Sequence, residues 1–333
     1  MCSNSSFSYF ATWQFQATTS HLLTFLTCPF NLFCGYCILK KTPKQYKTAK
    51  WYLLHLHSWT IFTDLILGAC VTPHMFFPAF AGISTGIFAF FAIPIPAQIF
   101  MAQIALGGLA TSIVMIFENR HHTLVRGKFK FEKNWARFLF YTIHGVYSIL
   151  FLLPVYFQIP EAYSAKMLLL RERLPCPHPD YYLDTVFVFT TNASTLIETA
   201  GIFIIFVVFE AIFMCFHSSF HLFRFDVKIS EQTRKMQRKL FGDMILQVSV
   251  PIFVIVVPMA YCLVASWALY YNQVLNNIAV IFITSHGISS TITIFATNHT
   301  YRQHFCHVIL RRKLKPSQMR RPSTITVNAV TQF

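Results

Sequence analysis

The sequence predicts an all-α integral membrane protein built as a bundle of seven transmembrane helices. Of its 333 residues, 55% are apolar and 12% are charged, whereas about 25% of the residues in an ordinary soluble domain are charged. Long apolar runs recur along the chain, each near the roughly 20 residues that a helix needs to cross the hydrocarbon layer. Between these runs, Lys and Arg gather in four separate segments.

The seven apolar runs are the expected transmembrane spans. They cover residues 21–39, 51–71, 93–117, 138–157, 196–217, 244–270 and 276–297. We expect helices, because a segment in lipid must satisfy its backbone polar groups internally and because the runs lack the alternation of barrel strands. This pattern predicts one membrane domain over residues 1–300 and a tail over residues 301–333.

The positions of the basic residues predict the orientation of the bundle. Of the 27 Lys and Arg, 24 lie in residues 40–50, 118–137, 219–243 and 298–333, whereas the loop of residues 158–195 is nearly neutral. Loops rich in Lys and Arg stay in the cytoplasm, so we expect the N-terminus outside and the C-terminus in the cytoplasm. The net charge of +15 then follows from the topology, and the basic loops are attracted to an anionic inner leaflet. We expect no nucleic-acid partner.

Two segments outside the spans have patterns of their own. The outer loop contains a short helical candidate, residues 163–174, and a loop of its length over a bundle is a candidate lid. In residues 301–315, apolar residues recur at helical spacing among basic ones, which is typical of a helix lying on the inner leaflet. Cys306 within it is a palmitoylation candidate.

The outer side also has candidate modification sites. Cys176 lies in the outer loop, in an oxidising compartment where a disulfide persists. Cys70 and Cys2 are both candidate partners, a free thiol is the alternative, and the sequence does not choose. Asn4 begins the glycosylation sequon Asn-Ser-Ser.

The strongest local signal is Glu118-Asn119-Arg120 at the inner end of span three. A carboxylate and a guanidinium at a helix mouth pair with each other or with neighbouring helices, and such a latch exposes a cytoplasmic cleft when it opens. The alternative is a helix end marked by ordinary flanking charges. Rhodopsin-like receptors carry an acidic-Arg-aromatic triplet at this place, and here the order is altered.

Three carboxylates lie within the apolar runs, and two of them, Asp64 and Glu198, are candidate site residues. Asp64 is near the middle of span two, where an acidic side chain costs about 2.5–3.5 kcal/mol on insertion scales, so we expect a partner inside the bundle. Either a cation site or switch, or a structural hydrogen bond to polar groups of spans one or seven, fits this position. Glu198, near the outer end of span five, faces either a ligand pocket or the lipid headgroups.

Aromatic residues and prolines are dense at the outer ends of spans two and three. Pro94 and Pro96 kink or delay span three, and such a break opens an apolar cleft toward the outside. We expect Gln98 and Gln103 to orient a small ligand there.

Metal and enzyme chemistry have little support in the sequence. His55 and His57 lie two residues apart and point to different helix faces, and no second cluster at ligand spacing accompanies them. We therefore expect no metal site and no cofactor, and an intramembrane enzyme is a weak alternative.

The chain resembles the nematode serpentine chemoreceptors of class H, in the Str superfamily. The motifs that carry the resemblance are Lys41-Thr42-Pro43-Lys44, Lys50-Trp51, residues 54–59 with Asp64-Leu65, residues 72–82, Ile93-Pro94 with Gln98, Phe117-Glu118-Asn119-Arg120, Leu174-Pro175-Cys176, His286-Gly287 and Tyr301-Arg302. They occur in order over nearly the whole chain. One departure is Thr300, where the family tends to have Pro.

The resemblance implies a G-protein-coupled chemosensory receptor on the sensory cilia of chemosensory neurons. It implies a small-molecule odorant or pheromone, which we place among spans three, five, six and seven, and a heterotrimeric G protein. We assign the coupling switch to Glu118, Asn119, Arg120 and Tyr301. A ligand-gated channel of seven spans is the alternative, and its N-terminus would lie inside the cell.

Overall fold

The computed structural model describes residues 8–43, 47–125, 129–174, 176–223 and 231–309. Within these residues, six helices are long and apolar enough to cross a membrane, and a bent helix pair makes a seventh span. The prediction of a seven-span helical bundle is confirmed. The helices of the spans are α1 (Trp13–Lys41), α2 (Lys47–Leu65), α4 (Ile95–Leu124), α5 (Asn134–Leu150), α8 (Ala193–Phe223), α9 (Glu231–Trp267), and the pair α10 (Gln273–Thr284) and α11 (His286–Thr297).

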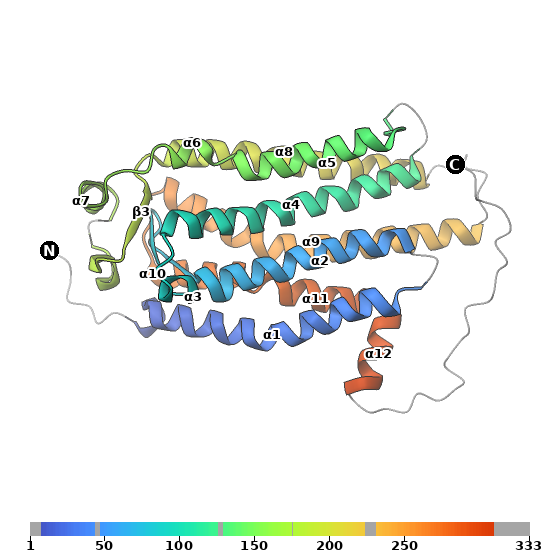
Figure 1. Ribbon diagram of the computed structural model, residues 1–333, viewed down its shortest axis with the longest axis horizontal. Coiled ribbons are helices and arrows are strands. Elements are labelled where there is room, and N and C mark those ends of the chain that lie inside the picture. Colours follow the sequence, from blue (N-terminus) through green and yellow to red (C-terminus); the bar gives the residue numbers. More distant parts are fainter. Residues whose placement is uncertain (1–7, 44–46, 126–128, 175, 224–230, 310–333) are drawn as a thin grey trace.

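Shorter elements lie at the two ends of this bundle (Figure 1). One end, here called the sheet end, carries three strands and α7; the opposite end, here called the α12 end, carries α12. The remaining helical elements are η1 (Tyr9–Ala11), η3 (Ile66–Val71), which continues α2, α3 (Ile87–Phe90), α6 (Leu153–Tyr156), α7 (Ala162–Glu172), η4 (Pro179–Tyr182) and α12 (His299–Ile309).

A three-stranded antiparallel sheet, which was not predicted from the sequence, covers the sheet end. Its strands, in the order β1, β2 and β3, are Pro73–Met75, Phe80–Ser84 and Phe187–Thr190. Phe80 pairs with Thr190 and Gly82 with Phe187, so the last strand comes from the long outer loop. Strands this short have too few residues for a clear alternation pattern, and this pairing depends on segments far apart in sequence.

The helix of the sixth span extends well beyond the apolar run from which it was predicted. The sixth span was expected to begin near residue 244, but α9 already begins at Glu231. Glu231 and Lys235 form an ion pair of 2.8 Å at helical spacing on its exposed first turns. Part of the predicted basic loop 219–243 is therefore helix. Polar residues with good helix propensity extend a helix into water, where ion pairs at helical spacing stabilise it.

The helix α4 is the centre of the bundle. It packs against α2, α5 and α8, while α9 packs against α10 and α11. Where α2, α4, α8 and α9 meet, buried side chains that include Leu56, Phe117, Met214 and Met244 form an apolar cluster. By contrast, α5 and α8 expose large apolar side chains such as Phe138 and Phe209, which suits contact with lipid tails.

The loop of residues 158–195 contains a disulfide-bonded cysteine. Cys176 is disulfide-bonded, whereas Cys70 is a free thiol, so the predicted pairing with Cys70 and the free-thiol alternative for Cys176 are wrong. The other predicted partner, Cys2, lies outside the described residues, as does the sequon at Asn4. Cys306 lies on α12 as a half-buried free cysteine, and its palmitoylation stays a prediction.

Candidate functional site

Asp64 lies at a junction of the first, second and seventh spans. Its side chain is 5% exposed, and one carboxylate oxygen accepts a hydrogen bond of 3.0 Å from Asn31 Nδ2 on α1. The other oxygen lies 3.2 Å from His286 Nδ1 and accepts from the backbone N–H of Gly287, also at 3.2 Å. Of the two interpretations made from sequence, the structural hydrogen bonds are present, and they reach both candidate spans.

This junction coincides with a break in the seventh span. The helices α10 and α11 bend by 43° around Ser285, and Asp64 accepts from a backbone N–H in the first turn of α11. A carboxylate is favourable at a helix N-terminus, because the unpaired N–H groups there carry partial positive charge. Gly287 is required for this approach, since a Cβ at that position would overlap the Asp64 carboxylate.

Further polar side chains surround Asn31. Its side-chain oxygen accepts from Thr291 Oγ1 at 2.5 Å, and its backbone oxygen lies 2.8 Å from His57 Nε2. His57 and His286 were noted from the sequence, whereas Asn31 and Thr291 were not predicted from it as neighbours of Asp64. Polar residues within apolar runs indicate that partners are needed inside the bundle. They do not indicate which helices pack together.

Glu118 pairs with the fourth span rather than with Arg120. Arg137 donates two hydrogen bonds to its carboxylate, at 2.9 Å from Nε and 2.7 Å from a terminal nitrogen, and Tyr141 donates a third. Arg137 also donates to the Tyr52 hydroxyl at 3.3 Å. A bidentate hydrogen bond between a guanidinium and a carboxylate is strong and fixes their relative orientation. Through these contacts the cluster joins α2, α4 and α5.

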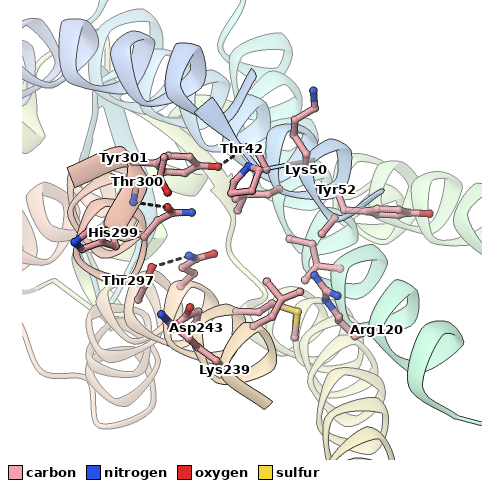
Figure 2. A pocket seen from close by; sticks show the side chains of 18 of the residues that line it. Thr42, Lys50, Tyr52, Arg120, Lys239, Asp243, Thr297, His299, Thr300 and Tyr301 are labelled. Carbon is pink, nitrogen blue, oxygen red and sulfur yellow. Dashed lines mark hydrogen bonds between the residues drawn. The ribbon is translucent and has the colours of Figure 1, made fainter. Parts of the chain in front are cut away.

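Arg120 and Asn119 face a cavity of about 220 Å³ at the α12 end. This α12 cavity lies between the ends of α2, α4 and α9 and the junction of α11 with α12 (Figure 2). Three basic side chains line it, Lys50, Arg120 and Lys239, together with one carboxylate, Asp243. Its lining is therefore positively charged.

Tyr301 lies across the α12 cavity from Arg120 in Figure 2. The tyrosine is 1% exposed, and its hydroxyl is 2.5 Å from Thr42 Oγ1 at the end of α1. On the α9 side, Gln247 donates to Thr297 Oγ1 at 2.7 Å. The structure thus brings three of the four predicted switch residues to one cavity and directs Glu118 elsewhere.

The predicted ligand residues divide between different places. Gln98 lines a second cavity of about 200 Å³ between the sheet and α4, here called the sheet cavity. Gln103 instead donates to the backbone oxygens of Ser148 and Ile149 on α5, at 3.3 and 2.7 Å. Glu198 is exposed and lines neither of these two cavities. The roles of all three in ligand binding stay predictions.

A buried polar cluster at the sheet end joins the hairpin, the outer loop and the last span. Fully buried His74 lies 3.4 Å from Gln273 Nε2 and 3.7 Å from Asp180, which also accepts from the backbone N–H of Trp13. Burial, and secondly the nearby His178, lower the pKa of His74 to about 3. His74 is therefore neutral near pH 7, and its contact with Asp180 is not an ion pair.

A polar pair that was not predicted from the sequence lies between the fourth and fifth spans. His144 Nε2 lies 2.5 Å from Glu210, and His144 Nδ1 contacts the Phe140 carbonyl oxygen at 2.8 Å. An acidic residue within an apolar run was the available signal, as for Asp64. Among the described residues, no group of three or more His, Cys, Asp or Glu has the geometry to hold a metal ion.

Comparison with known families shows to which family the chain belongs. The family model described as "Serpentine type 7TM GPCR chemoreceptor Srh" matches residues 11–311. The chain belongs to this family. Serpentine receptor class H-72 of Caenorhabditis elegans is 26% identical to this Srh chain over 298 residues, which cover 88% of the chain and 85% of that protein.

The fold is also that of a solved seven-helix protein. The crystal structure of squid rhodopsin superposes with a TM-score of 0.55 at 12% identity, covering 94% of the Srh chain and 91% of the rhodopsin chain. The class H resemblance inferred from sequence motifs is confirmed by the family match. The Srh chain is a multi-pass membrane protein of a chemoreceptor family, and its family is one of receptors rather than enzymes.

Proposed function

We propose that this Srh chain is a G-protein-coupled chemosensory receptor of the plasma membrane. The sheet end faces outside and receives a small molecule, and the α12 end faces the cytoplasm and receives a heterotrimeric G protein. By analogy with its family, we place it on the sensory cilia of chemosensory neurons. The bias of Lys and Arg toward the loops of the α12 end supports this orientation.

The positively charged α12 cavity is the observation that carries the proposal. It is lined by Lys50, Arg120 and Lys239 with Asp243 as the one carboxylate. The C-terminal end of a helix has unpaired carbonyl groups that carry partial negative charge, and a terminal carboxylate adds a full negative charge. A helical segment of the G protein that presents such an end therefore complements this cavity.

The polar junction at Asp64 supports a two-state bundle. It connects α1, α2 and the bend between α10 and α11 through hydrogen bonds of 3.0, 3.2 and 2.5 Å. The chain that follows this bend, α11, leads to Thr297 and Tyr301 in the α12 cavity. A ligand shifts such an equilibrium only through different affinities for the two states, and a change from 1:99 to 99:1 needs about 5.5 kcal/mol.

The test is nucleotide exchange on a co-expressed G-protein α subunit in membranes that carry the receptor, challenged with a broad mixture of small metabolites and odorants. We expect exchange with wild type and its loss with Arg120→Ala. The matched control is Arg171→Ala, an exposed arginine on α7 at the opposite end, which should leave exchange unchanged. Normal exchange in Arg120→Ala at equal surface level would contradict the assignment of the coupling face.

The channel alternative makes different predictions in the same membranes. It requires a cation current evoked by the mixture without nucleotide exchange, and an N-terminus inside the cell. Accessibility of an N-terminal tag in intact cells distinguishes the two orientations. An intramembrane enzyme would instead lose turnover, but not folding, on mutation of His55, His57 and Asp64.

A further inference from the structure

The sheet cavity has an almost entirely apolar wall. It lies between the three strands and the first turns of α4, and only Ser84 and Gln98 contribute polar side chains to its lining. The rest of its wall includes Ile95, Ile99 and Ala102 of α4. A site of this kind recognises a ligand by shape and by burial of apolar surface.

The two polar side chains are already satisfied by the protein. Ser84 Oγ lies 2.5 Å from Gln98 Oε1 and 2.7 Å from the Val71 carbonyl oxygen, and Gln98 Nε2 donates to the Ile93 carbonyl oxygen at 2.8 Å. The Ser84 hydroxyl has a single hydrogen, which it donates either to Gln98 Oε1 or to the Val71 carbonyl oxygen. The cavity therefore offers little to a polar ligand or to water, which needs two to four polar partners.

The volume limits the size of the occupant. An apolar protein cavity of about 150 Å³ stays dry and binds benzene, and this one is about 200 Å³. We propose that the sheet cavity binds a neutral hydrocarbon group of about six to ten non-hydrogen atoms. Such a group comes either from a free small molecule or from the end of a lipid tail.

The position of the cavity connects its occupant to the rest of the bundle. Its wall includes Val71, at the end of the helical segment that follows Asp64 in the second span, and Met75 of β1. The Met75 carbonyl oxygen accepts from Gln273 at the start of α10, at 2.9 Å. An occupant therefore acts on the second and seventh spans, which meet again at Asp64. This signalling role rests on the proposed function, whereas binding itself does not.

Binding is tested with fluorobenzene as the probe, on purified full-length receptor in lipid nanodiscs, by fluorine NMR with empty nanodiscs as the partition blank. We expect saturable binding in wild type that weakens at least tenfold in Ala102→Phe, which fills the cavity. The matched control is Ala97→Phe, at an exposed position on the same helix outside the cavity lining, and its binding should equal that of wild type.

An enlarging variant keeps the test valid if Ala102→Phe fails to fold. Ile99→Ala widens the same wall and should bind 1-fluoronaphthalene several-fold better than wild type does. Native mass spectrometry identifies the source of the hydrocarbon. A lipid retained by wild type and lost from Ala102→Phe indicates a lipid tail, whereas saturable fluorobenzene binding without retained lipid indicates a free molecule.

The proposal is overturned if wild type shows neither saturable binding nor a retained lipid, or if both probes bind all variants equally. Nucleotide exchange separates this outcome from failure of the proposed function. Fluorobenzene binding with no exchange in response to any mixture retains the site and refutes coupling. Exchange that is identical in wild type and Ala102→Phe, with neither probe binding nor a retained lipid in either, retains coupling and refutes the site.

Discussion

The sheet end and the α12 end of this receptor hold cavities of similar size and opposite chemistry. The sheet cavity, about 200 Å³, is walled by apolar side chains and its two polar side chains bond to each other. The α12 cavity, about 220 Å³, is lined by three basic side chains and a carboxylate. The first is suited to recognition by shape, and the second to recognition by charge. Between them, Asp64 joins the helices that reach both ends.

The largest effect should follow from breaking the junction between the two ends. In Gly287→Ala the new Cβ overlaps the Asp64 carboxylate, so either the bend or the second span must shift. We expect a loss of about 3 kcal/mol of stability, at the upper end of overpacking effects, and uncoupling of ligand from nucleotide exchange. Gly242→Ala is the control, because a Cβ there meets open space on α9. Thermal unfolding in nanodiscs measures the stability of both variants. Equal melting temperatures for Gly287→Ala and Gly242→Ala would contradict the proposed crowding.

A smaller effect should follow from disturbing the α12 end alone. Glu118→Gln removes the carboxylate to which Arg137 donates, and we expect the free energy of unfolding to fall by about 2–3 kcal/mol. This is below the roughly 3–5 kcal/mol of a fully buried pair, because the Arg137 side chain is 15% exposed. Adding Arg137→Met should recover part of the loss, which a double-mutant cycle measures.

Glu231→Gln is the matched control for Glu118→Gln. It breaks an ion pair whose side chains are 74% and 70% exposed. Exposed ion pairs contribute little to the stability of the fold. A cycle that shows Glu118 and Arg137 to act independently would rule out their pairing.

Acid should destabilise the sheet end through His74. The pKa of His74 is lowered to about 3 when folded, against about 6.5 when unfolded. The stability that neutral His74 contributes is thus complete above pH 6.5 and is lost as the pH falls toward 3, with a slope of at most about 1.4 kcal/mol per pH unit. Asp180 and His178 from the outer loop and Gln273 from α10 surround this ring.

The measurement is the melting temperature of wild type and His74→Gln between pH 7 and pH 4. Wild type should lose stability more steeply, because only its unfolded state takes up a proton at this position. Parallel curves would show that another group dominates the acid response.

The smallest effect should come from salt, and it sharpens the contrast between the two cavities. Raising the ionic strength from about 0.01 M to about 0.15 M shortens the Debye length from about 30 Å to about 8 Å. G-protein affinity for the positively charged α12 cavity should fall a few-fold, while fluorobenzene binding in the sheet cavity should not change. Equal salt dependence at both ends would contradict their assignment to charge and to shape.

The helical bundle could be predicted from sequence because its signals are local. A run of about 20 apolar residues is sufficient for a span, since lipid offers no other partner for the backbone. Boundaries were less accurate, as α9 begins at Glu231 rather than near residue 244. Outside the bilayer nothing in the apolar pattern marks the end of a helix.

The sequence by itself determined the seven spans, the placement of basic residues at one end and the presence of carboxylates that need partners. Only the tertiary structure decided that Glu118 pairs with Arg137, that Asp64 bonds to α1 and to the start of α11, and that Phe80 pairs with Thr190. The physical reason is distance along the chain. Hydropathy and charge act residue by residue, whereas a hydrogen bond or a cavity exists only after separate helices have packed.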